Sequence, residues 1–186
     1  MLSDVDIKKA LENGAITIED FDENRLQPAT YDVLLGNQFM TFDRHLTEAI
    51  DPKKPVDKFM NKIILDKKDD FFVLHPGEFA LGVTHDFIGC DDEHCIEIMG
   101  KSSLARLGLI IHTTAGFIDP GNSLNITLEL FNTNSLPIKL YPGMKIAQVA
   151  FYELSSKAAK PYGHKDLNSK YYGSREVQAS QMNKNF

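Results

Sequence analysis

The sequence is poor in the residues and segments that mark several large classes of protein. Its 186 residues include no Trp and two Cys, Cys90 and Cys95. Two cysteines cannot form a disulfide framework in a chain of this length, which favours reduced thiols and a cytoplasmic location. The longest apolar runs fall far short of the ~20 residues that a membrane-spanning helix needs. The first residues, MLSDVD, lack the basic and apolar regions of a signal peptide. We therefore expect a protein without a membrane partner.

The chain also has fewer basic than acidic residues. The chain has 20 Lys and Arg against 26 Asp and Glu, which gives a net charge of −6. A protein that binds a nucleic-acid backbone usually has the opposite balance or a clustered basic stripe. The composition therefore argues against nucleic acid as a partner. Hydrophobic residues make up 42% of the chain, enough to build the core of a single domain over residues 1–186.

Helical periodicity is confined to the start of the chain, where Ser3 and Asp6 suit a helix N-terminus and Gly14 suits its end. The rest consists of short segments rich in β-forming residues. Pro-Gly pairs at 76–77, 120–121 and 142–143, together with Gly36 and Gly89, separate them. We expect strands at 16–18, 31–35, 39–42, 63–65, 71–74, 79–83, 95–99, 109–112, 126–131, 138–141 and 146–154. Many short strands with turn signals between them predict a mostly β fold, a jelly roll or barrel.

Two segments are expected to lie outside the strands. Residues 43–70 are charged and contain Pro52 and Pro55, which predicts a long excursion from the sheet. Residues 162–186 are rich in Gly, Ser, Asn and Lys and contain few aliphatic residues. We expect this C-terminal tail to order only against a ligand or a neighbouring subunit.

The segment Gly100-Lys101-Ser102-Ser103-Leu104-Ala105-Arg106 follows an expected strand and is suited to one helical turn. Free N–H groups at such a turn, with a Lys, an Arg and two hydroxyls, can hold phosphate oxygens. A P-loop would need Gly at position 95, where the chain has Cys95. A capped surface turn with solvated charges is the simpler alternative.

The segment 113–121, Thr-Thr-Ala-Gly-Phe-Ile-Asp-Pro-Gly, places small residues around Phe117 and ends in a turn with Asp119. Small residues allow a ligand to approach the backbone closely. The carboxylate of Asp119 is suited to accept from a sugar hydroxyl or to orient a water molecule. The alternative is a β-turn in which this Asp bonds to its own backbone.

In the segment 125–131, Asn125, Thr127, Glu129 and Phe131 share one face of an expected strand. A Glu on a polar face is usually solvated. If that face lines a closed pocket, burial would raise the pKa of Glu129 and make it a proton shuttle.

The usual signs of metal and nucleophile chemistry are missing. Cys90 and Cys95 have no second ligand pair at zinc-site spacing. The H-x-E and P-C-x-x-C motifs of zinc nucleobase deaminases are absent, and so is a G-x-S-x-G elbow. We therefore expect no transition metal.

Taken together, these stretches closely resemble the dCTP deaminase family. The motifs that carry the likeness are GKSSLARLG at 100–108, HTTAGFIDPG at 112–121, ITLEL at 126–130, QPATYDVLLG at 27–36, LHPGEFA at 74–80 and LPIKLYPGMKIAQ at 136–148. PYG at 161–163 and SKY at 169–171 extend it into the tail. The resemblance covers nearly the whole chain, in order.

The resemblance implies a homotrimeric jelly roll or β-barrel related to trimeric dUTPase, with active sites between subunits and a tail, 162–186, that closes them. It implies deamination of dCTP without zinc, with Mg²⁺ held through the triphosphate. It also implies inhibition by dTTP, which would bind the same site and rearrange residues 112–117.

The resemblance also implies roles for individual residues. Glu129 would be the general base and acid, and Ser102 and Arg106 would orient the attacking water. The implied nucleotide contacts are Lys101, Ser102, Ser103, Leu104, Ala105 and Arg106 on the triphosphate and near the base, Asp119 on the deoxyribose, Thr127, Leu128 and Glu129 at the cytosine, and Gln148, Tyr162 and Lys170.

The chain departs from the family pattern at one position. The family usually has Gln four residues after the tail Lys, where this chain has Ser174. Because Ser is too short for the same reach, Arg175 or a water would have to substitute, or the tail would close differently.

Gly116 and Phe117 resemble the bifunctional members of the family, which form dUMP and pyrophosphate and so supply dUMP for dTMP synthesis. Without side-chain bulk at Gly116, a water would have room to reach the α-phosphate. The alternatives are a monofunctional enzyme that releases dUTP, a plain dUTPase, and a non-catalytic nucleotide sensor on the same scaffold.

Overall fold

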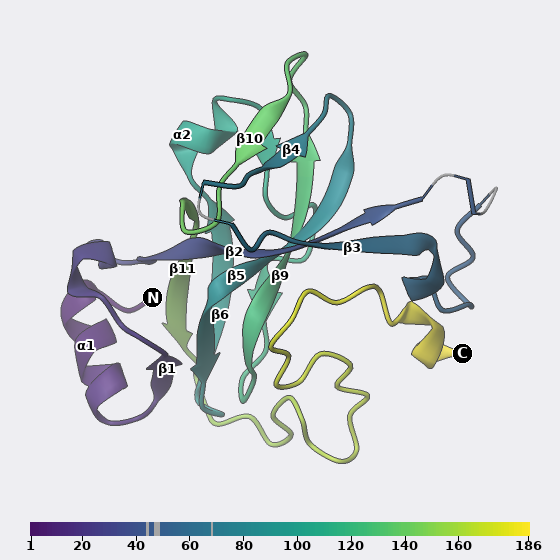
Figure 1. Ribbon diagram of the computed structural model, residues 1–186. Coiled ribbons are helices and arrows are strands. Elements are labelled where there is room, and N and C mark those ends of the chain that lie inside the picture. Colours follow the sequence, from purple (N-terminus) through teal and green to yellow (C-terminus); the bar gives the residue numbers. More distant parts are fainter. Residues whose placement is uncertain (44, 47–48, 68) are drawn as a thin grey trace.

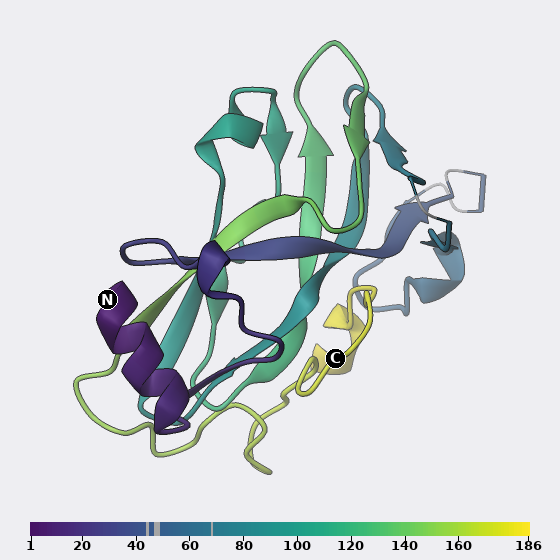
Figure 2. The same ribbon diagram turned by 60° about the vertical axis from the view of Figure 1, so that its left-hand side comes forward.

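The computed structural model describes residues 1–43, 45–46, 49–67 and 69–186. In these residues nine strands form one sheet in the order β7-β9-β5-β2-β11-β6-β8, with β1 paired to β5 and β3 paired to β2. β4 and β10 form a separate two-stranded sheet. The large sheet curls around a core of buried aliphatic side chains (Figures 1 and 2). The expectation of a mostly β fold is confirmed.

The strands are β1 (Ile16–Ile18), β2 (Tyr31–Phe42), β3 (Met60–Ile64), β4 (Phe72–Leu74), β5 (Phe79–Cys90), β6 (His94–Gly100), β7 (Leu109–Ile110), β8 (Phe117–Ile118), β9 (Ser123–Asn132), β10 (Ile138–Leu140) and β11 (Lys145–Glu153). The helices are α1 (Asp4–Glu12) and α2 (Ser102–Ala105), with 3₁₀ turns η1 (Glu23–Arg25), η2 (Asp57–Phe59) and η3 (Met182–Asn185). As expected, the Asp6 N–H donates to Ser3 Oγ at 3.3 Å at the start of α1. Gly14, with φ of 78°, follows its C-terminus.

Two glycines that we expected to separate strands, Gly36 and Gly89, lie inside strands instead. The segments expected at 31–35 and 39–42 form one strand, β2, which contains Gly36. A Cβ on Gly36 would lie 2.9 Å from the Val83 carbonyl oxygen, and one on Gly89 would lie 1.9 Å from Ser123 Oγ. These glycines therefore permit close backbone approach within the sheet, a use that a sequence cannot distinguish from a turn.

Strand β5 is longer than expected because a buried charge pair lies in its second half. Asp86, 2% exposed, accepts from Arg25 Nη1 at 2.6 Å and from the Leu34 N–H at 2.7 Å. The polar residues after Val83 suggest an end to the strand, but Thr84 and Asp86 are buried and hydrogen-bonded inside the fold while His85 is exposed, and β5 continues to Cys90.

The excursion expected at 43–70 is only partly correct. Within it, β3 pairs antiparallel with β2 along its whole length, with Phe39 opposite Ile63. Conversely, β8 lies where we expected no strand, just before the turn at Asp119, and Ile118 pairs with Ile96 of β6. This pairing fixes the segment that leads to Asp119.

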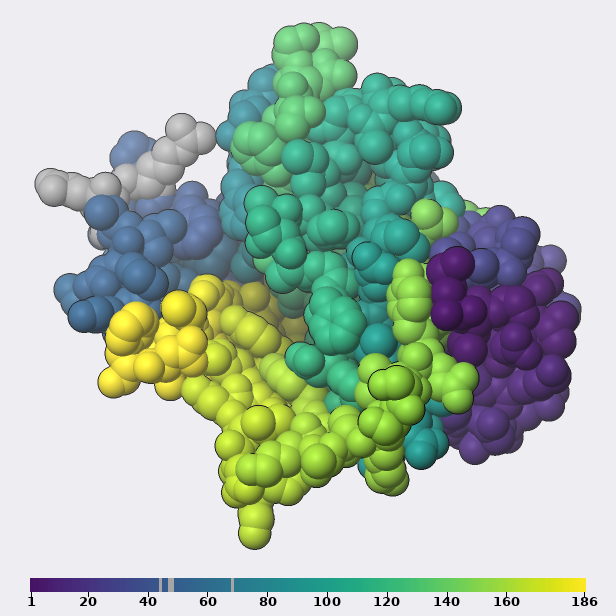
Figure 3. Space-filling model, turned by 180° about the vertical axis from the view of Figure 1, so that it is seen from behind, coloured from purple at the N-terminus to yellow at the C-terminus, as the bar shows by residue number. Residues whose placement is uncertain are grey.

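The C-terminal tail packs against its own chain. Val177, 5% exposed, lies in a small cluster with Met40, Leu81 and Val83. In Figure 3 the tail, coloured yellow-green to yellow, covers one end of the molecule. The tail thus packs in part on β2 and β5 of its own chain, a surface that the expectation did not include. Ordering of the tail by a ligand stays a prediction.

Among the described residues, no helix is both long enough and apolar enough to span a bilayer.

Candidate active site

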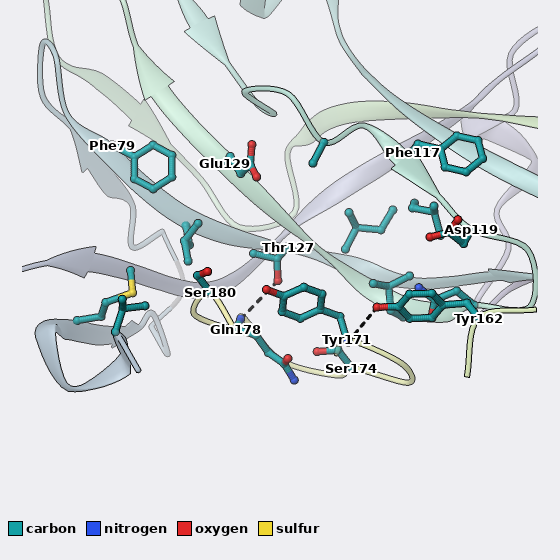
Figure 4. A pocket seen from close by; sticks show the side chains of 18 of the residues that line it. Phe79, Phe117, Asp119, Thr127, Glu129, Tyr162, Tyr171, Ser174, Gln178 and Ser180 are labelled. Carbon is teal, nitrogen blue, oxygen red and sulfur yellow. Dashed lines mark hydrogen bonds between the residues drawn. The ribbon is translucent and has the colours of Figure 1, made fainter. Parts of the chain in front are cut away.

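A cavity of about 540 Å³ lies between β9, the segment leading into β8 and the C-terminal tail (Figure 4). The side chains around it include apolar residues of the sheet and polar residues from two distant parts of the sequence. Its polar lining residues are Asp119, Asn122, Thr127, Glu129, Tyr162, Tyr171, Ser174, Gln178 and Ser180. We call it the Glu129 cavity. It brings together six of the residues that the sequence singled out: Phe117, Asp119, Thr127, Glu129, Tyr162 and Ser174.

Glu129 reaches this cavity because β9 alternates as expected. Leu128 is 0% exposed and packs in the core, whereas Thr127 and Glu129 are partly exposed on the cavity side. The Leu128 side chain points into the core, so the contact implied for Leu128 at the cytosine would have to come from its backbone. The Glu129 carboxylate accepts the Thr113 N–H through Oε2 at 2.7 Å. Its Oε1 has no hydrogen-bond partner among the residues that the structure describes, so it is free to meet a ligand or water.

Asp119 lies at the edge of the cavity on a turn that also holds the tail. The Asn122 N–H donates to the Asp119 carbonyl at 3.2 Å, and the Tyr162 N–H donates to the Pro120 carbonyl at 2.7 Å. The Tyr162 hydroxyl in turn accepts the Tyr171 N–H at 3.1 Å. Both tyrosine rings thus form part of the cavity wall in Figure 4.

Ser174 takes a structural position in the tail. It is 6% exposed, its hydroxyl donates to the Glu176 carbonyl at 3.0 Å, and its own carbonyl accepts the Asn125 N–H at 2.8 Å. Arg175, one of the suggested substitutes for the missing Gln, is paired with Glu19 instead. Its guanidinium donates two hydrogen bonds to the Glu19 carboxylate, at 2.6 and 2.7 Å, and lies 3.5 Å from the Phe87 ring centroid.

Gly116 packs closely against β6, a constraint that the sequence does not show. A Cβ there would lie 2.9 Å from the Ile98 carbonyl oxygen and 3.4 Å from the His112 ring. The lack of a side chain therefore lets this segment pack against β6. Phe117, by contrast, is 60% exposed and lines the cavity.

The residues implied for the phosphates lie elsewhere. The expected helical turn is present as α2, with Lys101 as its N-cap residue and Ser102, Ser103, Ala105 and Arg106 exposed around it. Figures 1 and 2 place α2 at the opposite end of the molecule from the tail. None of the described residues 101–106 lines the Glu129 cavity, and neither does Gln148 or Lys170.

Lys101 belongs to a polar cluster of its own, which we call the Lys101 cluster and which consists of Gln27, Thr30, Asp32, Lys101, Lys145 and Gln148. Lys101 Nζ lies 2.5 Å from Asp32 Oδ1, and Lys145 Nζ lies 3.1 Å from Asp32 Oδ2. The Gln148 amide accepts from the Thr30 hydroxyl at 3.2 Å and donates to the Gly100 carbonyl at 3.5 Å.

Sequence reasoning gave no role to Asp32, Lys145, Tyr171 or Gln178. The one signal for Asp32 is a charged residue between Tyr31 and Val33 in an otherwise apolar strand segment. For the other three the sequence contains no comparable signal.

In the described parts of the chain, no group of three or more His, Cys, Asp or Glu side chains comes together as a metal site. The carboxylate nearest Lys101 is Asp32, which is already shared between two ammonium groups. These residues fit an ion that is held by phosphate oxygens better than one held by the protein.

A family model described as dCTP deaminase-like matches residues 1–154. The chain belongs to the dCTP deaminase-like family. It is 46% identical over its whole length to a dUMP-forming dCTP deaminase of Clavibacter michiganensis, of which it covers 92%. It is 47% identical to the protein of the same name from Tropheryma whipplei, of which it covers 94%.

Solved structures agree with this family assignment at the level of the fold. A 2′-deoxycytidine 5′-triphosphate deaminase from Agrobacterium tumefaciens matches 81% of the chain with a TM-score of 0.62 at 21% identity. This chain spans 46% of that longer chain. The dUTPase of EIAV matches 82% of this chain and 98% of its own, with a TM-score of 0.50 at 20% identity. The dCTP deaminase-like chain thus has a dUTPase-type fold.

Proposed function

We propose that this chain is a dUMP-forming dCTP deaminase, which converts dCTP into dUMP, ammonia and pyrophosphate without zinc. The observation that carries the proposal is the Glu129 cavity, where a carboxylate with one free oxygen meets Asp119, Thr127 and Tyr162. The full-length relatives named dUMP-forming dCTP deaminase support the choice of substrate and product. Formation of dUMP would supply dTMP synthesis.

In the proposed reaction Glu129 moves protons during hydrolysis at C4 of cytosine. Oε1 takes a proton from a water whose oxygen bonds to C4, and the carboxyl delivers this proton to N3. It then takes the second proton from the new C4 hydroxyl and delivers it to the exocyclic amine, so that the bond from C4 to this nitrogen breaks, the C4 carbonyl forms and ammonia departs. The Thr113 N–H at Oε2 fixes the orientation of the carboxylate and leaves Oε1 for this work. Asp119 would accept a hydrogen bond from the deoxyribose.

Cleavage of the triphosphate needs one further water at the α-phosphate, with pyrophosphate as the leaving group. The Lys101 and Arg106 side chains would bind the phosphates, and the N–H groups at the start of α2 would add to them. Mg²⁺ bound with the nucleotide would neutralise charge on the phosphate oxygens. The residues of this chain would then orient the polyphosphate chain and stabilise the leaving group.

The same proposal includes a homotrimer with sites between subunits. Within one chain the Glu129 cavity and the α2 turn lie at separate places, so a nucleotide that contacts both needs α2 from a second copy. The apolar side chains of Leu107, 52% exposed, and Ile110, 38% exposed, follow α2 and suit an interface. A cyclic trimer would supply three such interfaces.

Inhibition by dTTP also belongs to the proposal, and the contact between Thr113 and Glu129 supports it. Because the Thr113 N–H fixes the catalytic carboxylate, a rearrangement of residues 112–117 around a thymine nucleotide would remove that hydrogen bond. Inhibition would then appear as loss of dCTP turnover in the presence of excess dTTP. Turnover that is unchanged by dTTP would contradict this part of the proposal.

The experiment that tests the activity supplies dCTP and dUTP separately and measures ammonia, pyrophosphate and the nucleotide products. A dUMP-forming deaminase releases ammonia and pyrophosphate in equal amounts from dCTP. Accumulation of dUTP with ammonia and no pyrophosphate would indicate the monofunctional enzyme. Release of pyrophosphate from dUTP, with no product from dCTP, would indicate a dUTPase. Binding of dCTP without any product from either nucleotide would indicate a sensor.

Replacing Glu129 by Gln should abolish deamination, because the amide keeps the shape of the side chain and loses its basicity. Loss of a general acid–base group commonly costs about 10²–10⁴-fold in rate. The measurement is ammonia release, with dCTP affinity by calorimetry as the control for an intact site. Ammonia release within about tenfold of the unmodified protein would rule out Glu129 as the proton shuttle.

A further inference from the structure

A buried carboxylate shared between two lysines lies next to the start of α2. Asp32 is 2% exposed, and its two oxygens lie 2.5 Å from Lys101 Nζ and 3.1 Å from Lys145 Nζ. The Lys101 side chain is 22% exposed and that of Lys145 is 44% exposed, so both ammonium groups remain within reach of solvent. No other charged side chain among the described residues lies within ion-pair distance of Asp32.

An irregularity in the pairing of β11 with β2 places Lys145 there. Gln148 pairs with Asp32 and Ala147 with Val33, but Lys145 pairs with Leu34, which shows a register shift between positions 145 and 147. Ile146 and Ala147 are consecutively buried at this shift. Such a bulge changes the face to which a side chain points. It therefore puts Lys145 on the same side of the sheet as Asp32 and Gln148, although strict alternation would separate positions 145 and 148.

The charges of this trio do not cancel. One carboxylate with two ammonium groups has a net charge of about +1, in a chain whose overall charge is −6. Breaking the only ion pair of a buried carboxylate raises the free energy of the folded protein, because it leaves a buried charge without a counterion. With Lys145 present, Lys101 can leave Asp32 for a phosphate oxygen while Asp32 keeps a counterion.

We propose that Lys145 is a positioning residue for polyphosphate binding, which holds the charge of Asp32 so that the Lys101 ammonium is available to the triphosphate. This inference rests on the proposed function, since it takes the α2 turn as the phosphate site. It assigns a role to a residue outside that turn. It also explains why the bulge in β11 directs a lysine towards a carboxylate that already has a partner.

The test measures binding of inorganic tripolyphosphate by calorimetry together with kcat and KM for dCTP. Lys145→Met should weaken tripolyphosphate binding and raise KM about three- to tenfold, with kcat within about twofold, because Lys101 stays on Asp32. Lys145→Arg retains the charge and should stay close to the unmodified protein. The double variant Asp32→Asn with Lys145→Met should recover binding, since the neutral amide no longer retains Lys101. The control is Lys139→Met on β10, whose ammonium lies 4.2 Å from the Phe71 ring centroid and should leave KM unchanged.

Two results would overturn the proposal. One is unaltered tripolyphosphate affinity in a folded Lys145→Met variant, and the other is equal weakening by Met and Arg at this position. Comparison of Lys145→Met with Lys145→Arg tests the proposal even if variants at Asp32 fail to fold. Calorimetry with tripolyphosphate does not depend on deamination, so a failure of the proposed activity can be told apart from a failure of this inference.

Discussion

Glu129 depends on the backbone of residues 112–117 for the orientation of its carboxylate. The Thr113 N–H donates to Oε2 at 2.7 Å, and the Ile98 N–H holds the same segment by donating to the Gly116 carbonyl at 2.8 Å. Any side chain at position 116 would press against the backbone of β6. A change at this residue therefore reaches Glu129 through the main chain.

Replacing Gly116 by Ala should reduce ammonia and pyrophosphate release together. The added Cβ would lie 2.9 Å from the Ile98 carbonyl oxygen, closer than a real contact allows, so the segment must shift and carry Thr113 with it. Both products are measured from dCTP, with Thr114→Ser as a neighbouring control on an exposed residue that does not line the Glu129 cavity. Selective loss of pyrophosphate with normal ammonia release would show instead that position 116 acts on the hydrolytic water.

Cys90 should react slowly with thiol reagents in the folded protein. Burial raises the pKa of its thiol to about 12, and the thiolate is the reactive form. Because the pKa is raised, the thiolate fraction stays small from neutral pH up to strongly alkaline pH. Alkylation at pH 8 followed by mass spectrometry should modify Cys90 far faster in denaturant than without it. Equal rates in the two conditions would contradict its burial.

At the scale of the elements, the tail is held on the sheet by contacts at successive residues. Ser174 bonds to the backbone of β9, Arg175 pairs with Glu19, and Glu176 lies 2.5 Å from Lys62 of β3. The Glu19 and Arg175 side chains are both about half exposed. An exposed ion pair alone contributes little to stability. Its bidentate geometry and the stacking on Phe87 fix where the tail crosses the sheet, and with it the position of Tyr171.

Reversing the charge of Arg175 to Glu should raise KM for dCTP and lower kcat by about two- to tenfold each, as expected when a closing segment is loosened. Adding Glu19→Arg should recover most of the loss, because the pair is restored with opposite polarity. Lys157→Glu, which breaks an exposed ion pair with Asp92 outside the tail, is the matched control. If the double reversal is no better than Arg175→Glu alone, the pair does not position the tail.

At the scale of the whole molecule, the Glu129 cavity and the α2 turn lie apart within one chain, so the proposed site requires a second copy. Light scattering should show a trimer, and a stable monomer that turns over dCTP would contradict the shared site. Mixing two inactive variants gives a sharper test. In a trimer with shared sites, Glu129→Gln and Arg106→Ala subunits refolded together should regain about a quarter of the original activity, since one interface in four combines two intact halves. No recovery after verified subunit exchange would place both residues in one chain's site.

The sequence by itself determined most of the local structure and singled out six of the residues that line the Glu129 cavity. The cap at Ser3, the short β-rich segments and the alternation along 125–131 depend on neighbours in the chain, so composition and periodicity predict them. The alternation already placed the Leu128 side chain on the face of the strand opposite to Glu129. The order of motifs was sufficient for the family resemblance.

Only the tertiary structure decided which residues meet. In the sequence, Gly36 and Gly89 suggest turns, but in the fold they lie in strands where the neighbouring strand leaves no room for a Cβ. Asp86 suggests the end of a strand, but its carboxylate is paired with Arg25 from a distant part of the chain. Asp32 joins two lysines that are 69 and 113 positions further along the chain, the second only because β11 has a bulge. Such contacts depend on strand register and on the curl of the sheet, which arise from the packing of the whole core. The position of α2 away from Glu129 is likewise a property of the fold that no local pattern contains.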